Sequence, residues 1–77
     1  MNLYIINKVL FDCSAGMAVI AAPSFDRCRE IFVEEFSHYI GEFDTAIEDG
    51  NYKVIEGGDL LSVDYPEGVV SHVFGGG

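Results

Sequence analysis

The sequence predicts an α+β fold, in which one amphipathic helix packs on one face of a small antiparallel β-sheet in the order β-β-α-β-β. Two apolar runs separated by a turn cluster open the chain, a helical period follows, and two further apolar runs close it. One helix on one face of a sheet is the economical way to bury such segments. A chain of 77 residues suits a single domain, and we assign residues 1–74 to it and residues 75–77 to a flexible glycine tail.

The first two apolar runs predict a β-hairpin. Asn2–Phe11 is dense in Ile, Leu, Val, Tyr and Phe, the residues that suit a pleated surface. Asp12–Gly16, with the sequence DCSAG, is a turn cluster, and Met17–Ala22 is the second run. We therefore expect two antiparallel strands joined by a longish loop.

The segment after the hairpin changes to a helical period. Ser24 is a candidate N-cap, Asp26 lies in the first turn, where the helix dipole favours an acid, and Gly41 is a candidate stop. The opposite face of this helix presents charged side chains to water. The residues that form its apolar face are Phe25, Cys28, Phe32, Phe36, Tyr39 and Ile40, with Ile31 beside them.

The second half of the chain is less regular. Tyr52–Glu56 predicts a strand, and Phe43–Ile47 is compatible with a strand paired to it, a loop or a helical turn. Gly57–Gly68 predicts a loop, with a short extended piece at Leu60–Val63. Val69–Phe74 predicts the last strand.

The first strand is apolar on both of its faces, so one apolar face of the sheet has no predicted helix to cover it. Alternation predicts that four of its residues share one face and that three share the other, namely Leu3, Ile5, Val9 and Phe11 against Tyr4, Ile6 and Leu10. Because one helix covers one face, we expect an apolar patch on the other, with Tyr4 and Ile6 in it. Either a homodimer or the 57–68 loop would cover that patch.

Charge is the most informative global feature of the chain. The formal net charge is −9, and residues 30–67 carry eleven acids against Lys53 alone, while residues 1–29 are nearly balanced. Such an acidic segment repels nucleic acid and anionic lipid, and it attracts basic protein surfaces. We therefore expect no direct nucleic-acid or membrane binding.

The spacing of reactive side chains does not point to catalysis. Cys13, Cys28, His38 and His72 show none of the spacings typical of metal ligands or of a Cys–His pair, so we expect no enzyme activity, metal or cofactor. Cys28 is predicted to be a small buried thiol. Because no apolar run approaches about 20 residues and no cleavage signal is evident, we expect a soluble, cytoplasmic protein.

The C-terminal sequence FGGG resembles that of ubiquitin-like sulfur carriers, in which the C-terminal glycine is adenylated and thiolated. The similarity covers the order of elements and the tail, and the sequence GDLLSV (residues 58–63) is similar to their penultimate strand. This resemblance implies an alternative function in which the terminal glycines carry sulfur.

A broader resemblance links the chain to small proteins encoded by phages and prophages. It covers Val19–Ile31, Tyr52–Gly57 and Gly68–Gly77, and the chain departs from it by an acidic insertion where tryptophan-rich positions are expected. Some small phage proteins of this build are similar to anti-CRISPR inhibitors, many of which are acidic and occupy basic grooves that hold guide RNA or target DNA. The resemblance implies action in the cytoplasm of a host cell.

Charge and resemblance lead to one principal hypothesis. The chain is predicted to be a small acidic, non-enzymatic inhibitor or regulator that mimics nucleic acid and binds a basic, nucleic-acid-handling protein surface. The carboxylates would pair with lysine and arginine of the partner, and two tyrosines would serve as aromatic anchors. The predicted binding residues are Glu30, Glu34, Glu35, Glu42, Asp44, Glu48, Asp49, Tyr39 and Tyr52. The sulfur carrier, and an interaction module that dimerises through the sheet, are the alternatives.

Overall fold

The computed structural model describes residues 1–12, 14–56 and 65–75. It is a small α+β fold with a four-stranded antiparallel sheet, as predicted. The prediction of one helix was wrong, because two helices and a 3-10 turn lie between the second and third strands. The elements are β1 (Asn2–Asp12), β2 (Ser14–Ala22), α1 (Phe25–Glu35), η1 (Ser37–Tyr39), α2 (Ile40–Glu48), β3 (Tyr52–Ile55) and β4 (Gly68–Val73).

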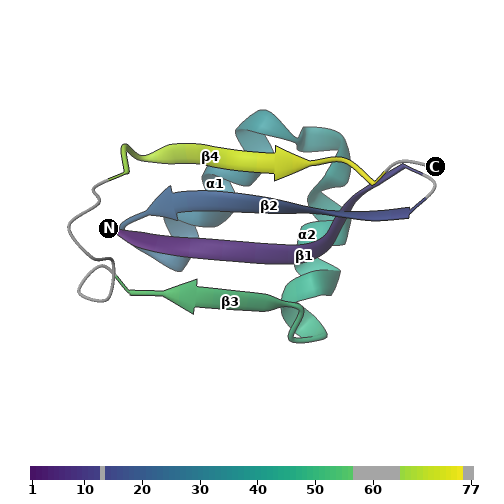
Figure 1. Ribbon diagram of the computed structural model, residues 1–77, viewed down its shortest axis with the longest axis horizontal. Coiled ribbons are helices and arrows are strands. Elements are labelled where there is room, and N and C mark those ends of the chain that lie inside the picture. Colours follow the sequence, from purple (N-terminus) through teal and green to yellow (C-terminus); the bar gives the residue numbers. More distant parts are fainter. Residues whose placement is uncertain (13, 57–64, 76–77) are drawn as a thin grey trace.

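The sheet is built around the β1–β2 hairpin. Its strand order is β3-β1-β2-β4, so the hairpin supplies the two central strands and the later strands pair with its outer edges. The helices pack on one face of the sheet, as Figure 1 shows, with α1 against β2 and β4 and with α2 against β1. We call α1, η1 and α2 the helical layer, and we call the opposite side of the sheet the open face.

The predicted helix breaks earlier than its apolar period suggests. It ends at Phe36, whose φ of −132° and ψ of 51° leave the helical region, and Gly41 lies inside α2 rather than at a helix stop. Phe36 is buried, and its backbone N–H still donates to the carbonyl of Phe32. The break redirects the chain, so that Phe43–Ile47, whose structure the sequence left open, is helical.

Aromatic rings from both helices fill the space between the helical layer and the sheet. Phe32 and Phe43 are fully buried, with ring centroids 4.8 Å apart, and Phe25 lies 5.8 Å from Phe43. A fully buried side chain of this size contributes about 1.5–3 kcal/mol to stability. These contacts therefore attach α2 to α1 as well as to the sheet.

An irregularity near the end of β1 changes which side chains reach the core. Lys8 and Leu10 have positive φ values of 59° and 54°, and the β1–β2 register shifts on both sides of Val9. As a result Val9 and Leu10 are both fully buried, whereas Phe11 is 46% exposed. The prediction that Val9 shares a face with Leu3 and Ile5 was wrong, because simple alternation does not survive a bulge.

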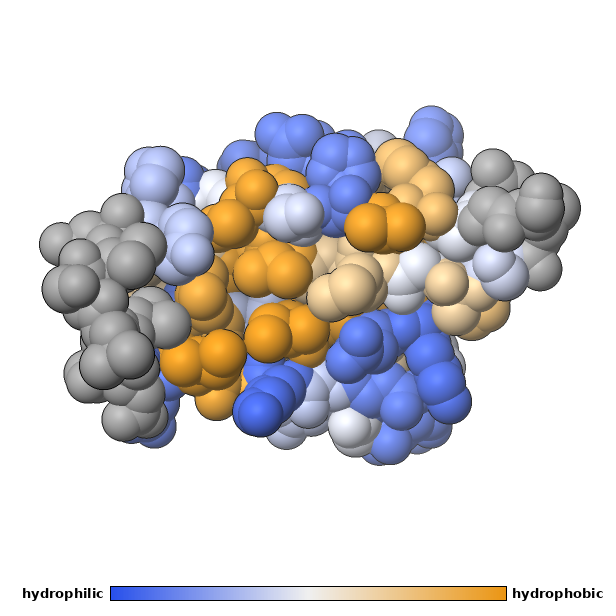
Figure 2. Space-filling view, in the orientation of Figure 1, coloured by the Kyte–Doolittle hydropathy of each residue, from blue (hydrophilic) through white to orange (hydrophobic). Residues whose placement is uncertain are grey.

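The face assignment of the first strand was also wrong. Tyr4 and Ile6 belong to the core cluster beneath the helical layer, so the open face carries Leu3 and Ile5 instead. The sequence did correctly predict that a partly apolar face remains outside the helix–sheet core. Figure 2 views the molecule from the open face, where hydrophobic residues gather across the middle and hydrophilic residues lie toward the margins.

The C-terminal glycines begin as part of the fold. Gly75 is buried, and its backbone N–H donates to the carbonyl oxygen of Leu10 over 3.0 Å. The predicted flexible tail of residues 75–77 therefore excludes Gly75. Gly76 and Gly77, Cys13 and the predicted extended piece Leu60–Val63 lie outside the described residues.

Candidate binding surface on the helical layer

The N-terminus of α1 is fixed by the residues that the sequence indicated. The Ser24 side chain accepts a hydrogen bond from the backbone N–H of Arg27 over 3.3 Å, and Asp26 lies in the first turn. A serine N-cap satisfies one of the backbone donors that a helix start leaves unpaired. This cap sets the rotation of α1 and therefore the direction in which its charged side chains project.

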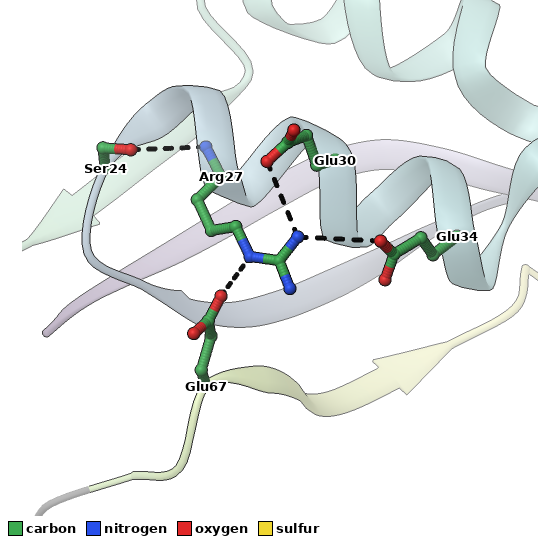
Figure 3. A network of polar contacts seen from close by, with 5 residues as sticks. All are labelled: Ser24, Arg27, Glu30, Glu34 and Glu67. Carbon is green, nitrogen blue, oxygen red and sulfur yellow. Dashed lines mark hydrogen bonds and ion pairs between the residues drawn. The ribbon is translucent and has the colours of Figure 1, made fainter.

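Arg27 gathers three carboxylates at the edge of the helical layer (Figure 3). Its Nε donates to Glu67, beside the start of β4, and its Nη1 lies 3.5 Å from Glu30 and 3.6 Å from Glu34. The hydrogen bond with Glu67 is the main reason that the pKa of Arg27 is raised. Two of the predicted binding residues thus form an internal network, yet their side chains stay 66% and 65% exposed.

A second arginine connects the two helices. Arg29 of α1 donates from Nε and Nη2 to the two carboxylate oxygens of Asp44 in α2, over 3.0 and 2.9 Å. This two-pronged geometry is the favoured arrangement of an arginine and a carboxylate. The hydrogen bond lowers the pKa of Asp44, so its carboxylate is held in the charged form. Because the pair is half exposed, its contribution to stability is small.

Glu42 and Asp49 lie at a hollow between α2 and the end of β1. Glu42 Oε1 accepts a hydrogen bond from the backbone N–H of Phe11 over 3.2 Å. The hollow has a volume of about 270 Å³. Lys8, Phe11, Gly41, Glu42, Thr45, Ala46, Asp49 and Asn51 line it. The positive φ of Lys8 and Leu10 shapes the β1 side of this hollow.

Three of the predicted acids have no salt bridge to any residue that the structure describes. Within the described parts of the chain, Glu35, Glu48 and Asp49 show neither an ion pair nor a side-chain hydrogen bond, and all three are exposed. Six of the seven predicted carboxylates therefore belong to the helical layer and Asp49 directly follows it, but they do not form one cluster. Some pair with Arg27 near β4, one pairs with Arg29 between the helices, some lie at the hollow, and the others are exposed without a described partner.

The two predicted tyrosine anchors lie in different settings. Tyr39 is half-buried in η1, with its ring 5.7 Å from that of Phe74. Tyr52 is 41% exposed and pairs with Ile6, which places it on the helical side of β3. Of the two, Tyr52 presents more of its ring to a partner.

Other chemistry-bearing residues are placed as follows. Cys28 is a buried free thiol, as predicted, and burial raises its pKa to about 12. Across residues 1–12, 14–56 and 65–75, no three His, Cys, Asp or Glu side chains gather closely enough to hold a metal ion. In the same residues, no helix combines the length and the apolar character needed to cross a membrane.

Comparison with known proteins gave no relative from which a function could be transferred. No protein-family model, no curated protein and no solved structure matches this chain. The resemblances to phage-encoded proteins, to anti-CRISPR inhibitors and to sulfur carriers therefore stay predictions from the sequence.

Sequence reasoning missed the residues that order the acids. Arg27 lies three residues before Glu30 and seven before Glu34, a spacing that places all three on one side of a helix and could have been recognised. The pairing of Arg29 with Asp44 had no such signal, because it joins two helices whose mutual packing depends on the break at Phe36. The role of Phe11 at the hollow depends on the bulge in β1.

Proposed function

We propose that this protein is a small non-enzymatic inhibitor or regulator that docks through its helical layer onto a basic protein surface, of the kind that otherwise holds nucleic acid. The observation that carries the proposal is the segregation of charge. Residues 25–49, which contain the helical layer, hold eight carboxylates and two arginines. By contrast, the part of the open face formed by Leu3–Asn7 and its strand partners carries no carboxylate.

The two arginines support this proposal by ordering part of the layer. Arg27 holds Glu30 and Glu34, and Arg29 holds Asp44, so that these side chains lose less rotamer freedom when a partner binds. A carboxylate has about four lone-pair positions, so one internal contact leaves room for a lysine or arginine from outside. Glu35, Glu48 and Asp49 have no partner among the described residues and are free for such contacts.

A comparison of two charge reversals tests the proposal. Glu48→Lys changes the net charge by the same amount as Glu56→Lys, but Glu48 lies in α2 whereas Glu56 follows β3 outside the helical layer. We expect Glu48→Lys to weaken capture of partner proteins from host lysate at least about tenfold, and Glu56→Lys to change it little. Free Glu48 is chosen because reversing Glu34 or Asp44 would also break an internal pair.

Two further readouts separate mimicry from other kinds of binding. Captured proteins should be released by a competing DNA or RNA oligonucleotide, and binding should weaken steeply between low and high salt. Circular dichroism spectra of both variants should match that of the wild type. Capture that is indifferent to salt and equal for both variants would contradict the proposal.

A further inference from the structure

The open face has the composition of an interface centre surrounded by a rim. The central strands contribute only apolar side chains to it over their first paired residues: Ile5 and Val19, which are half-buried, and Leu3 and Ala21, which are already buried within the single chain. The edge strands contribute both polar and apolar side chains, Lys53 and Ile55 from β3 and Ser71 and Val73 from β4. Protein interfaces show this same order, with an apolar centre depleted of charge and a polar margin.

The hydrophobic part of this face is continuous. Met17 and Ile55 extend it along the sheet and are half-buried, as are Ile5 and Val19. At the end of β4, Val73 is 57% exposed. Figure 2 shows these strands as a broad hydrophobic area across the middle of the molecule. A continuous, partly exposed apolar area is typical of a contact surface.

The net charge of the chain restricts how a second copy could cover this face. Two copies of a chain with net charge −9 repel each other unless their acidic sides are kept apart. Contact through the open faces does so, because each sheet then separates its own helical layer from the partner. The two helical layers would be roughly 30 Å apart, from layer spacings of about 10 Å, which is several screening lengths at physiological salt.

The size of the face also suits a homodimer. The principal extents of the molecule are 36 × 23 × 21 Å. The whole side of the molecule that bears the open face, its hydrophilic margins included, therefore measures on the order of 800 Å², which is what each partner contributes, centre and rim together, to a stable interface of standard size. Two sheets that pack face to face form a sandwich in which both apolar faces become interior.

We propose that a second copy of this chain covers the open face, so that the protein is a homodimer of two sheets packed face to face with both helical layers outward. The contact is isologous, meaning that the same patch of each copy meets the other. The proposal does not rest on the docking function of the helical layer. If both hold, the dimer presents two acidic surfaces on opposite sides.

Sedimentation analysis of two neighbouring substitutions tests the dimer. The wild type should sediment with twice the chain mass of 8.4 kDa. Ile55→Asp places a carboxylate on the open face of β3, and because the contact is isologous the dimer would bury it twice; we expect dimerisation to weaken at least about 100-fold. Val54→Asp is the matched control, since Val54 is 39% exposed on the helical side of the same strand and should leave the dimer intact.

Further measurements keep the result unambiguous. Circular dichroism reports whether Ile55→Asp folds, and Val73→Asp, at the exposed end of β4, should also give a folded monomer. Salt at about 0.5 M should leave the dimer intact while it weakens docking by the helical layer, so that the two proposals fail separately. A wild-type monomer at up to about 1 mM overturns the proposal. In that case, binding of a hydrophobic dye would indicate that the open face is available to a different protein. No dye binding would indicate that the chain itself covers the face.

Discussion

At the scale of single residues, the backbone of Gly75 lies against that of Ser14. A Cβ atom placed on Gly75 would overlap the carbonyl oxygen of Ser14, and backbone atoms cannot move aside as a flexible side chain can. The N–H of Gly75 also donates to the carbonyl of Leu10, so the segment is held in place. Glycine is required here by space rather than by a special φ angle.

This contact leads to a prediction about two glycines. We expect Gly75→Ala to lower the free energy of unfolding by about 1–3 kcal/mol, because the added methyl group forces the end of the chain away from β1 and β2. Gly41→Ala is the control: apart from the backbone of its own helix and its chain neighbours, no atom lies within 4 Å of the added methyl in α2, and alanine favours a helix over glycine by about 0.5–1 kcal/mol. In thermal unfolding, Gly75→Ala should lower the Tm and Gly41→Ala should raise it. A neutral Gly75→Ala would show that Gly75 is not held as described.

Some single residues could be interpreted from the sequence and others could not. Ser24 as a cap and Cys28 as a buried thiol follow from local spacing, and both predictions are confirmed. The bidentate pair of Arg29 and Asp44 joins residues that are fifteen positions apart on different helices, so no local sequence pattern predicts it. Pairs of this kind depend on tertiary packing and appear only once the fold is known.

At the scale of elements, the sequence predicted every strand that the structure describes but only one of the two helices. Ile40, Phe43 and Ile47 follow a helical period, yet Gly41 was interpreted as a helix stop and obscured it. Phe36 is buried where α1 ends, and α2 then continues through Gly41. Tertiary packing here outweighs the local preference of glycine.

The end of β1 escaped prediction for a related reason. Positive φ angles are normally signalled by glycine or asparagine, but here they occur at Lys8 and Leu10. The fold tolerates this strain because it buries both Val9 and Leu10. The burial that offsets the backbone strain depends on the tertiary fold, so the local sequence does not indicate the irregular backbone.

The role of α2 can be tested through its central aromatic residue. Phe43 is fully buried and contacts the rings of Phe32 and Phe25, so Phe43→Ala should destabilise the fold by about 3–5 kcal/mol. In a domain this small, a loss of that size approaches the whole stability. Thr45→Ala, at an exposed position of the same helix, should change the stability by less than about 0.5 kcal/mol. Denaturant unfolding would measure both, and equal effects would contradict the packing of α2.

At the scale of the whole molecule, the two sides of the sheet differ in kind. One side carries the helical layer with most of the described acids, and the other is apolar across its middle. The sequence predicted the charge of the middle segment and the presence of an apolar face, because both follow from composition and alternation. It did not predict which residues form that face, since the bulge and the correct pairing are properties of the assembled sheet.

A net charge of −9 also affects the stability of the molecule as a whole. Four basic residues cannot balance thirteen acids, so folding brings like charges together, and salt should relieve that repulsion. If screening recovers about 1 kcal/mol, added sodium chloride raises Tm by roughly 4–8 °C. The double variant Glu35→Gln and Glu48→Gln removes two unpaired charges, so it should start from a higher Tm and gain less from salt. Calorimetry at matched protein concentration would measure this, and a Tm that falls with salt would mean that the internal pairs of Arg27 and Arg29 outweigh the repulsion.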